Sequence, residues 1–320
     1  MSLISTPLDV INKQSETHSY SVDDIDWNLS VNKNIFWAPE NLISISHLPI
    51  YSELSNEFKV VFNQYNSLGI AEIFMLFEEY ALAPSMSKAL ERADSEELKI
   101  ALQNFVDEEY KHSLCFKKLL LQAAPNLYHP ENFKFRFIRL SPVGRFLFST
   151  LKRFPVLIPS WVWLAIFFEE RTLMFSREYI HANKVDSQKL DQLFYQVHYY
   201  HMIDEVRHVK LDEHLIKNYY KTFGQIHSRF VAWVVYKFIR RSVYPINMIQ
   251  SCLKHIKMFH PHLITAEIEK KIYSQATDLP QNKSFLEQNF SENAAPRTRY
   301  LMEQYSEFKQ FWSDVTKIVQ

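Results

Sequence analysis

Two segments of this chain carry the same step, a glutamate followed three positions later by a histidine, inside largely apolar stretches. They are Glu109-Tyr110-Lys111-His112 and Glu205-Val206-Arg207-His208. A Phe-Glu-Glu triplet precedes each of them, at Phe77-Glu78-Glu79 and at Phe168-Glu169-Glu170. One glutamate from each of two helices, together with Glu-x-x-His from each of two others, is the ligand set of dinuclear iron or manganese sites in four-helix bundles. The pattern therefore predicts a buried dinuclear metal site.

The order of these motifs is more informative than any one of them. Glu-x-x-His also occurs at Glu178–His181, where the helix is expected to end near Asn183, and we interpret that copy as a decoy. The two main steps follow their upstream glutamates by 31 and 36 residues, about the length of two antiparallel helices and a turn. The alternative is a bundle that buries the same glutamates and histidines without a metal. Unpaired buried charge makes that alternative costly.

A third histidine falls on the same helical stripe. At about 100° per residue, His201, Glu205 and His208 lie within a narrow arc, so His201 is a candidate nitrogen ligand. His198 lies near this stripe and is expected to pack beside the site. Asp107 and Asp204 are either acceptors for the ring N–H groups of ligand histidines or surface acids.

Composition excludes several other classes of site. The chain has 320 residues, 47% of them hydrophobic, but only 3 glycines, so glycine-rich phosphate loops and dinucleotide-binding fingerprints are absent. Two cysteines, Cys115 and Cys252, cannot form a disulfide framework and are expected to be free thiols. The polar start of the chain has no signal-peptide pattern, which predicts a cytoplasmic protein.

Apolar periodicity and proline positions predict an all-α protein. We expect an irregular arm over residues 1–40, a four-helix bundle over 41–225 and a helical extension, packed on the bundle, over 226–320. The expected helices cover 52–83, with a stop or kink at Pro84, and then 96–123, 159–182, 187–220, 226–258, 264–275 and 295–318. A proline-punctuated crossover occupies 126–158. The longest apolar run, 154–168, is too short and interrupted to span a bilayer.

Charge is segregated along the chain although the 36 basic and 36 acidic residues balance. The basic segments 134–153 and 217–257 contain no acid and are rich in aromatic residues. Such segments are either solvated faces or surfaces for an anionic partner, for which an acidic carrier protein and an anionic membrane surface are the candidates. No nucleic-acid recognition motif is present. A homodimer is left open, as is peripheral attachment to a membrane.

At these residues the chain resembles the aminobenzoate N-oxygenase family of di-iron proteins. The resemblance covers roughly residues 40 to 225. It rests on Glu78 six residues before Pro84, on Glu108-Glu109-x-x-His112, and on His201-x-x-Asp204-Glu205-x-x-His208, whose extra histidine is a mark of the family. It implies a ferritin-like four-helix bundle with additional C-terminal helices. The metal ligands that it implies are Glu78, Glu109, His112, Glu169, His201, Glu205 and His208.

The resemblance implies an O2-dependent di-iron oxygenase that acts on a small-molecule substrate, by N-oxygenation of an amine or by hydroxylation of a small aromatic or acyl compound. Two iron ions are the expected cofactor, with manganese as the alternative. A hydroxylase or desaturase for carrier-tethered or lipid substrates is a second hypothesis, and a non-catalytic metal-binding helical protein is a third. The electron donor is left open. So are the choices of Glu169 against Glu170 and of Glu78 against Glu79.

Overall fold

The computed structural model describes residues 6–139, 146, 149, 158–220, 225–242, 245–291 and 293–309, with only the backbone given for 219–220, 225–226 and 241–242. Within these ranges the regular structure is helical, apart from one isolated bridge between Phe36 and Leu190. The predicted all-α class is confirmed.

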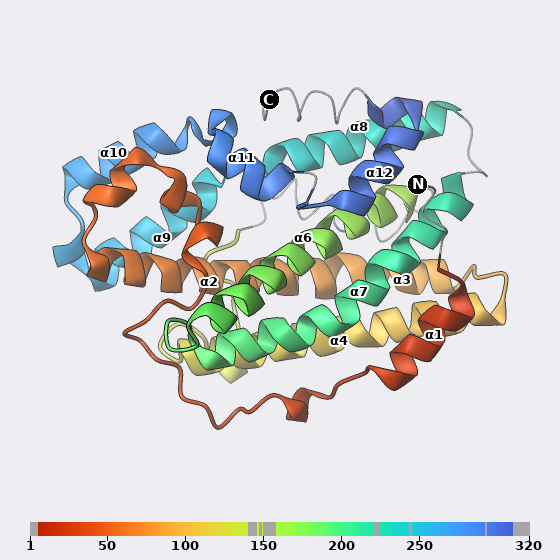
Figure 1. The fold of residues 1–320 in the computed structure, drawn as a ribbon, viewed down its shortest axis with the longest axis horizontal. Helices are drawn as coiled ribbons and strands as arrows, with labels where there is room; N and C mark the ends of the chain where they lie inside the picture. The colour runs from red at the N-terminus through yellow and green to blue at the C-terminus, as the bar shows by residue number, and fades with distance from the viewer. Residues whose placement is uncertain are drawn as a thin grey trace.

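Four long helical segments run side by side and form the bundle (Figure 1). They are α2 (Asn56–Phe77) with its continuation α3 (Ala83–Leu90), α4 (Glu96–Ala123), α6 (Ile158–Val185) and α7 (Gln192–Tyr220). Serine side chains cap two of these helices, because Ser55 accepts a hydrogen bond from the backbone N–H of Phe58 and Ser95 from that of Leu98. Between the helices lies a continuous hydrophobic core.

A π-helical turn, Glu78–Leu82, joins α2 to α3. The sequence predicted a stop or kink at Pro84, and the helical path instead widens just before this residue and then continues to Leu90. Proline lacks an N–H, and its ring clashes with the carbonyl four residues earlier, here that of Tyr80. The wide turn relieves this clash, and it begins at Glu78, one of the predicted ligands.

Shorter helices surround the bundle (Figure 1). The N-terminal helix α1 (Leu8–Thr17) packs on α4 and α7, although the sequence predicted an irregular stretch here. The predicted helix 226–258 is divided in two, because Pro245 starts a new helix. The two parts are α8 (Gln225–Ser242), which packs on α6, and α9 (Ile246–Phe259), which packs on α2. The remaining helices are α10 (Ala266–Ala276), α11 (Lys283–Phe290), which was not predicted, and α12 (Pro296–Gln304). Residues 310–318 of the last predicted helix lie outside the described residues.

Buried polar side chains fasten the connecting segments to α2. Asn63 accepts hydrogen bonds from the backbone N–H groups of Trp37 and Ala38 and donates to the carbonyl of Ala38. Glu72, which is fully buried, accepts hydrogen bonds from the backbone of residues 136–138 and from the hydroxyl of Tyr128. These contacts hold the chain before the bundle and the start of the crossover against one helix. No helix in the described ranges is long and apolar enough to cross a membrane.

Candidate metal centre

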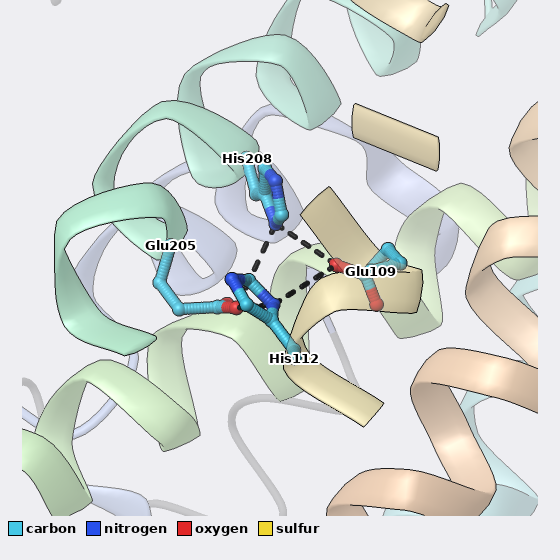
Figure 2. Close-up of side chains that lie close together, drawn as sticks. All are labelled: Glu109, His112, Glu205 and His208. Carbon is cyan, nitrogen blue, oxygen red and sulfur yellow. Dashed lines mark ion pairs between the residues drawn. The ribbon is translucent and has the colours of Figure 1, made fainter. Parts of the chain in front are cut away.

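The two Glu-x-x-His steps face each other from α4 and α7. Glu109, His112, Glu205 and His208 are all at most 1% exposed, and they converge between the two helices (Figure 2). Glu109 Oε1 lies 3.0 Å from His208 Nδ1, and Glu205 Oε1 lies 3.2 Å from His112 Nδ1. Each glutamate therefore approaches the histidine of the opposite helix, as expected for groups that share a dinuclear centre.

The other predicted ligands join the same cluster. His201 Nε2 lies 3.0 Å from Glu78 Oε1 and 3.0 Å from Glu205 Oε1, and its ring centroid is 4.4 Å from that of His112. Glu169 Oε1, from α6, lies 3.8 Å from His208 Nδ1. The structure thus brings together side chains from the π-helical turn, α4, α6 and α7. The cluster contains all seven predicted positions, Glu78, Glu109, His112, Glu169, His201, Glu205 and His208.

The geometry also distinguishes the members of the two Glu-Glu pairs, between which the sequence alone could not choose a ligand. Glu79 is half-buried and accepts a hydrogen bond from Ser113 Oγ at 3.0 Å. Glu170 accepts hydrogen bonds from the backbone N–H groups of Arg297 and Thr298, at 2.8 and 2.7 Å, and so binds the N-terminus of α12. Glu78 and Glu169 point into the cluster, whereas Glu79 and Glu170 have structural partners elsewhere.

Two carboxylates contact the ring nitrogens of His112 and His208 that face away from the cluster. Asp204 Oδ2 lies 2.9 Å from His112 Nε2, and Glu108 Oε2 lies 2.9 Å from His208 Nε2. When each ring donates its Nε2–H to its carboxylate, Nδ1 turns toward the cluster as an unprotonated, more basic nitrogen. Asp107 does not take this part, because it is exposed and accepts a hydrogen bond from Gln103. Glu108, one position along, was not assigned a role from the sequence.

Cations and the N-terminal helix complete this outer layer. Arg207 donates to both Asp204 and Glu108, Lys111 Nζ lies 2.6 Å from Asp204 Oδ2, and Ser15 Oγ in α1 donates to Glu108 Oε1 at 2.7 Å. A groove of about 250 Å³ between α1 and α4 is lined by Ser15, Glu108 and Lys111 among others. The groove therefore reaches the carboxylate that orients His208, while the ligand cluster itself stays buried.

The unsatisfied hydrogen-bonding atoms fit a cationic group at the centre. Each of the seven side chains has a buried nitrogen or oxygen with no hydrogen-bond partner among the described residues. For His201 this atom is Nδ1, whereas its Nε2 faces Glu78 and Glu205. Leaving one such group unpaired costs about 1–3 kcal/mol, so the unpaired atoms that His112, His208 and the glutamates gather in one place require a common partner. Four carboxylates and three imidazoles suit iron or manganese. The residues present therefore fit a pair of metal ions.

The pKa values within the cluster are displaced in opposite directions. Burial and the neighbouring Glu109 raise the pKa of Glu78 well above its usual range. Burial opposes charge on His112, but hydrogen bonds to Asp204 and Glu205 outweigh it and raise the pKa of His112 to about 10. Burial and the adjacent His112 lower the pKa of His201 well below its usual range. Opposite shifts of the pKa within one buried cluster indicate that burial and neighbouring charges act differently on each of its groups.

Other residues that the sequence singled out lie outside the cluster. His198 is buried, stacks on Tyr179 with ring centroids 4.1 Å apart, and has a pKa lowered to about 3 by burial. His181 is exposed, and Glu178 accepts a hydrogen bond from Asn41, so neither member of the decoy step contributes.

Comparison with known proteins adds a family to this geometry. None of the curated proteins matches the chain. A family model described as "P-aminobenzoate N-oxygenase AurF" matches residues 6–277, which is most of the chain. That family consists of ferritin-like di-iron oxygenases, so the enzyme class and the iron cofactor expected from the sequence are confirmed. The chain belongs to the p-aminobenzoate N-oxygenase AurF family.

Proposed function

We propose that this protein is a di-iron N-oxygenase that oxidises the amino group of a small aromatic amine with O2. Its two iron ions would be held by Glu78, Glu109, His112, Glu169, His201, Glu205 and His208. One observation carries the proposal: seven buried carboxylate and imidazole groups converge from four helical segments, and each keeps an unsatisfied polar atom. His201 supports the assignment to an N-oxygenase, because an imidazole one turn before the Glu-x-x-His step is a mark of that family.

When bound, the iron pair supplies the activation of O2 that no amino-acid side chain provides. The surrounding side chains orient the nitrogen and oxygen donors that would hold the ions. The Asp204 carboxylate fixes the ring of His112, and Glu108 fixes that of His208. Both carboxylates are themselves held by Arg207, so the two ring orientations are coupled through one guanidinium group.

Aromatic side chains exclude water from the same space. Phe105 stacks on His208 with ring centroids 3.9 Å apart, and Phe74 stacks on His201 at 5.6 Å. Phe116 meets the ring of His201 edge-on at 5.2 Å. An apolar lining strengthens the attraction between metal and carboxylate and keeps reactive oxygen species from water. The lining also suits the aromatic ring of an arylamine, whose amino group is uncharged at neutral pH.

The proposal is tested in two steps on the full chain. Elemental analysis after anaerobic ferrous loading should give about two irons per chain, and less than about 0.3 would contradict the metal site. The loaded protein is then given O2, a chemical reductant and p-aminobenzoate, and mass spectrometry follows added oxygen on nitrogen. Oxygen found only on ring carbon would identify a hydroxylase instead. Activity with manganese and not with iron would leave the site in place and change the cofactor.

A further inference from the structure

The outward face of α8 combines exposed aromatic and basic side chains. Trp233 is 57% exposed and Phe230 is 46% exposed, and their rings stack with centroids 6.2 Å apart. Arg229, Lys237 and Arg240 are also exposed. At about 100° per residue these five positions fall within roughly 100° of arc, so they form one stripe along the helix. We call this stripe the α8 outer face.

The opposite side of the same helix is buried. Val231, Val235 and Ile239 are fully buried, and α8 packs on α6. The helix is therefore already anchored by an apolar side, and the aromatic pair is not needed for that packing. A tryptophan and a phenylalanine exposed side by side mark an interaction surface more often than isolated exposed residues do.

The charge carried by α8 itself has one sign. The chain has no aspartate or glutamate between Glu213 and Glu267. Within the described part of the chain, Arg229, Lys237 and Arg240 form no ion pair, although Arg240 lies over the ring of Tyr236. Two other lysines of the basic segment 217–257 differ, because Lys217 pairs with Glu213 and Lys257 with Glu269. Among the described side chains of α8, all of the charged lysines and arginines therefore lie on the outer face and are unneutralised.

We propose that the α8 outer face binds the surface of an anionic lipid bilayer. Tryptophan and phenylalanine enter the boundary between headgroups and acyl chains, while arginine and lysine contact anionic headgroups, which is the chemistry of an interfacial amphipathic helix. Trp233 sits at the middle of the stripe with cations on both sides along the helix, which matches this arrangement. The proposal goes beyond the N-oxygenase function and does not depend on it.

Two other occupants fit the face less well. A second copy of the chain, docked by twofold symmetry, would bring three cations against three cations, and like charges in an interface are unfavourable. An acidic protein would satisfy the charges but would need an apolar recess for the stacked rings of Phe230 and Trp233. A bilayer satisfies both requirements without a shaped recess.

The test uses the iron-loaded full chain and vesicle flotation. Vesicles of equal parts phosphatidylglycerol and phosphatidylcholine should bind the protein, and pure phosphatidylcholine vesicles should bind it at least about tenfold more weakly. Binding should be largely lost in about 1 M salt, where the screening length falls to about 3 Å. Phe230→Ser with Trp233→Ser, and separately Arg229→Gln with Lys237→Gln, should each lower the partition coefficient about tenfold or more.

A matched variant on another face provides the control. Leu114→Ser with Lys99→Gln removes an exposed apolar and an exposed basic residue from α4 and should leave vesicle binding unchanged. Iron content and circular dichroism establish that each variant is folded. Quenching of Trp233 fluorescence by brominated lipid, absent in Trp233→Phe, gives a second measurement on an almost unaltered protein. Equal binding by all variants would overturn the proposal, as would a dimer that depends on Trp233 or binding to polyglutamate in preference to anionic vesicles.

Discussion

At the scale of single residues, the three histidines of the centre differ in which ring nitrogen contacts a carboxylate. His112 and His208 each direct Nε2 to a carboxylate, whereas Nε2 of His201 faces Glu78 and Glu205. His201 therefore differs from the other two histidines in having no carboxylate behind it among the described residues. The three histidines are not equivalent, and substitutions should separate their contributions.

His201→Ala should leave part of the iron bound, because six of the seven proposed ligands remain, and should abolish turnover. Loss of this imidazole removes a ligand from one ion only, and so lowers the affinity of that ion more than that of the other. Iron titration with elemental analysis would detect this as a stoichiometry between one and two. His198→Ala, which removes a buried histidine stacked on Tyr179, is the matched control and should keep two irons. Full iron occupancy with normal turnover in His201→Ala would refute the ligand role.

Asp204→Asn should weaken metal binding by about 10–100-fold, because the carboxylate that orients His112 and increases its basicity is replaced by a neutral amide. Glu108→Gln should act similarly through His208. Asp107 comes directly before Glu108 in the chain but lies on the exposed side of α4, so Asp107→Asn should leave the metal affinity unchanged. Competition with a coloured chelator measures all three. Equal affinities for Asp204→Asn and Asp107→Asn would show that the ring contact has no influence on the metal.

Metal affinity should increase with pH. A proton on His112 is favoured by its partners Asp204 and Glu205, which raise its pKa to about 10, so a metal ion must displace that proton below this pH. Each displaced proton makes the apparent affinity rise about tenfold per pH unit until the pKa is reached. Calorimetry in buffers of different ionisation enthalpy counts the protons released. Uptake of protons on binding, or an affinity that falls from pH 6 to pH 9, would contradict this account.

At the scale of elements, Glu170 ties the C-terminal helix α12 to the same helix that carries Glu169. Glu170→Gln should destabilise the protein by about 1–3 kcal/mol, because the charged acceptor of two backbone N–H groups is weakened, and should leave iron content at two. Glu169→Gln should instead lower the iron content, and should change the free energy of unfolding of the metal-depleted protein less than Glu170→Gln does. Urea unfolding of the metal-depleted proteins, together with iron analysis, distinguishes the two. Metal loss in Glu170→Gln alone would exchange their assignments.

Sequence patterns predicted the elements that carry apolar periodicity and missed those that do not. Helix α4 has the predicted bounds because Ser95 caps its start and Pro125 follows its end. Helix α1 was missed because it docks through polar contacts, Ser15 to Glu108 and Asn12 to the carbonyl of Glu97, with Ile11 as its one buried hydrophobic residue. The helix 226–258 was predicted as continuous because its apolar pattern continues across Pro245.

For the site, the sequence predicted the residues that the structure gathers but not the layer around them. The Glu-x-x-His spacing follows from helix geometry, so it is visible in sequence. The role of Glu108 is not, because its partners Arg207, His208 and Ser15 come from elements about 100 residues away in the chain. Of the three consecutive acids, Asp107 to Glu109, the spacing to His112 identified Glu109 as a ligand, but nothing local showed that Glu108 reaches His208. The division into arm, bundle and extension stays a prediction.

At the scale of the whole molecule, metal binding and folding should be coupled. Each ion that binds only the folded chain stabilises it by about 2.7 kcal/mol when free metal is a hundredfold above its dissociation constant. Removing iron with a chelator should therefore lower the melting temperature by at least about 5 °C. Scanning calorimetry with and without chelator measures this, with readdition of iron as the control. An unchanged melting temperature would mean that no metal in the preparation is bound within the bundle.

The π-helical turn Glu78–Leu82 has a consequence for protein engineering. A π turn accommodates one residue more than the α-helical turn it replaces. Deleting Tyr80, which is 43% exposed, together with Pro84→Ala, which removes the proline that the wide turn accommodates, should convert Glu78–Leu82 into ordinary α-helix and leave α2 and α3 in register with their neighbours. The carboxylate of Glu78 would then rotate away from His201. The shortened protein should fold with unchanged helical circular dichroism and bind close to one iron. One deletion and one substitution would thus turn a dinuclear protein into a mononuclear scaffold.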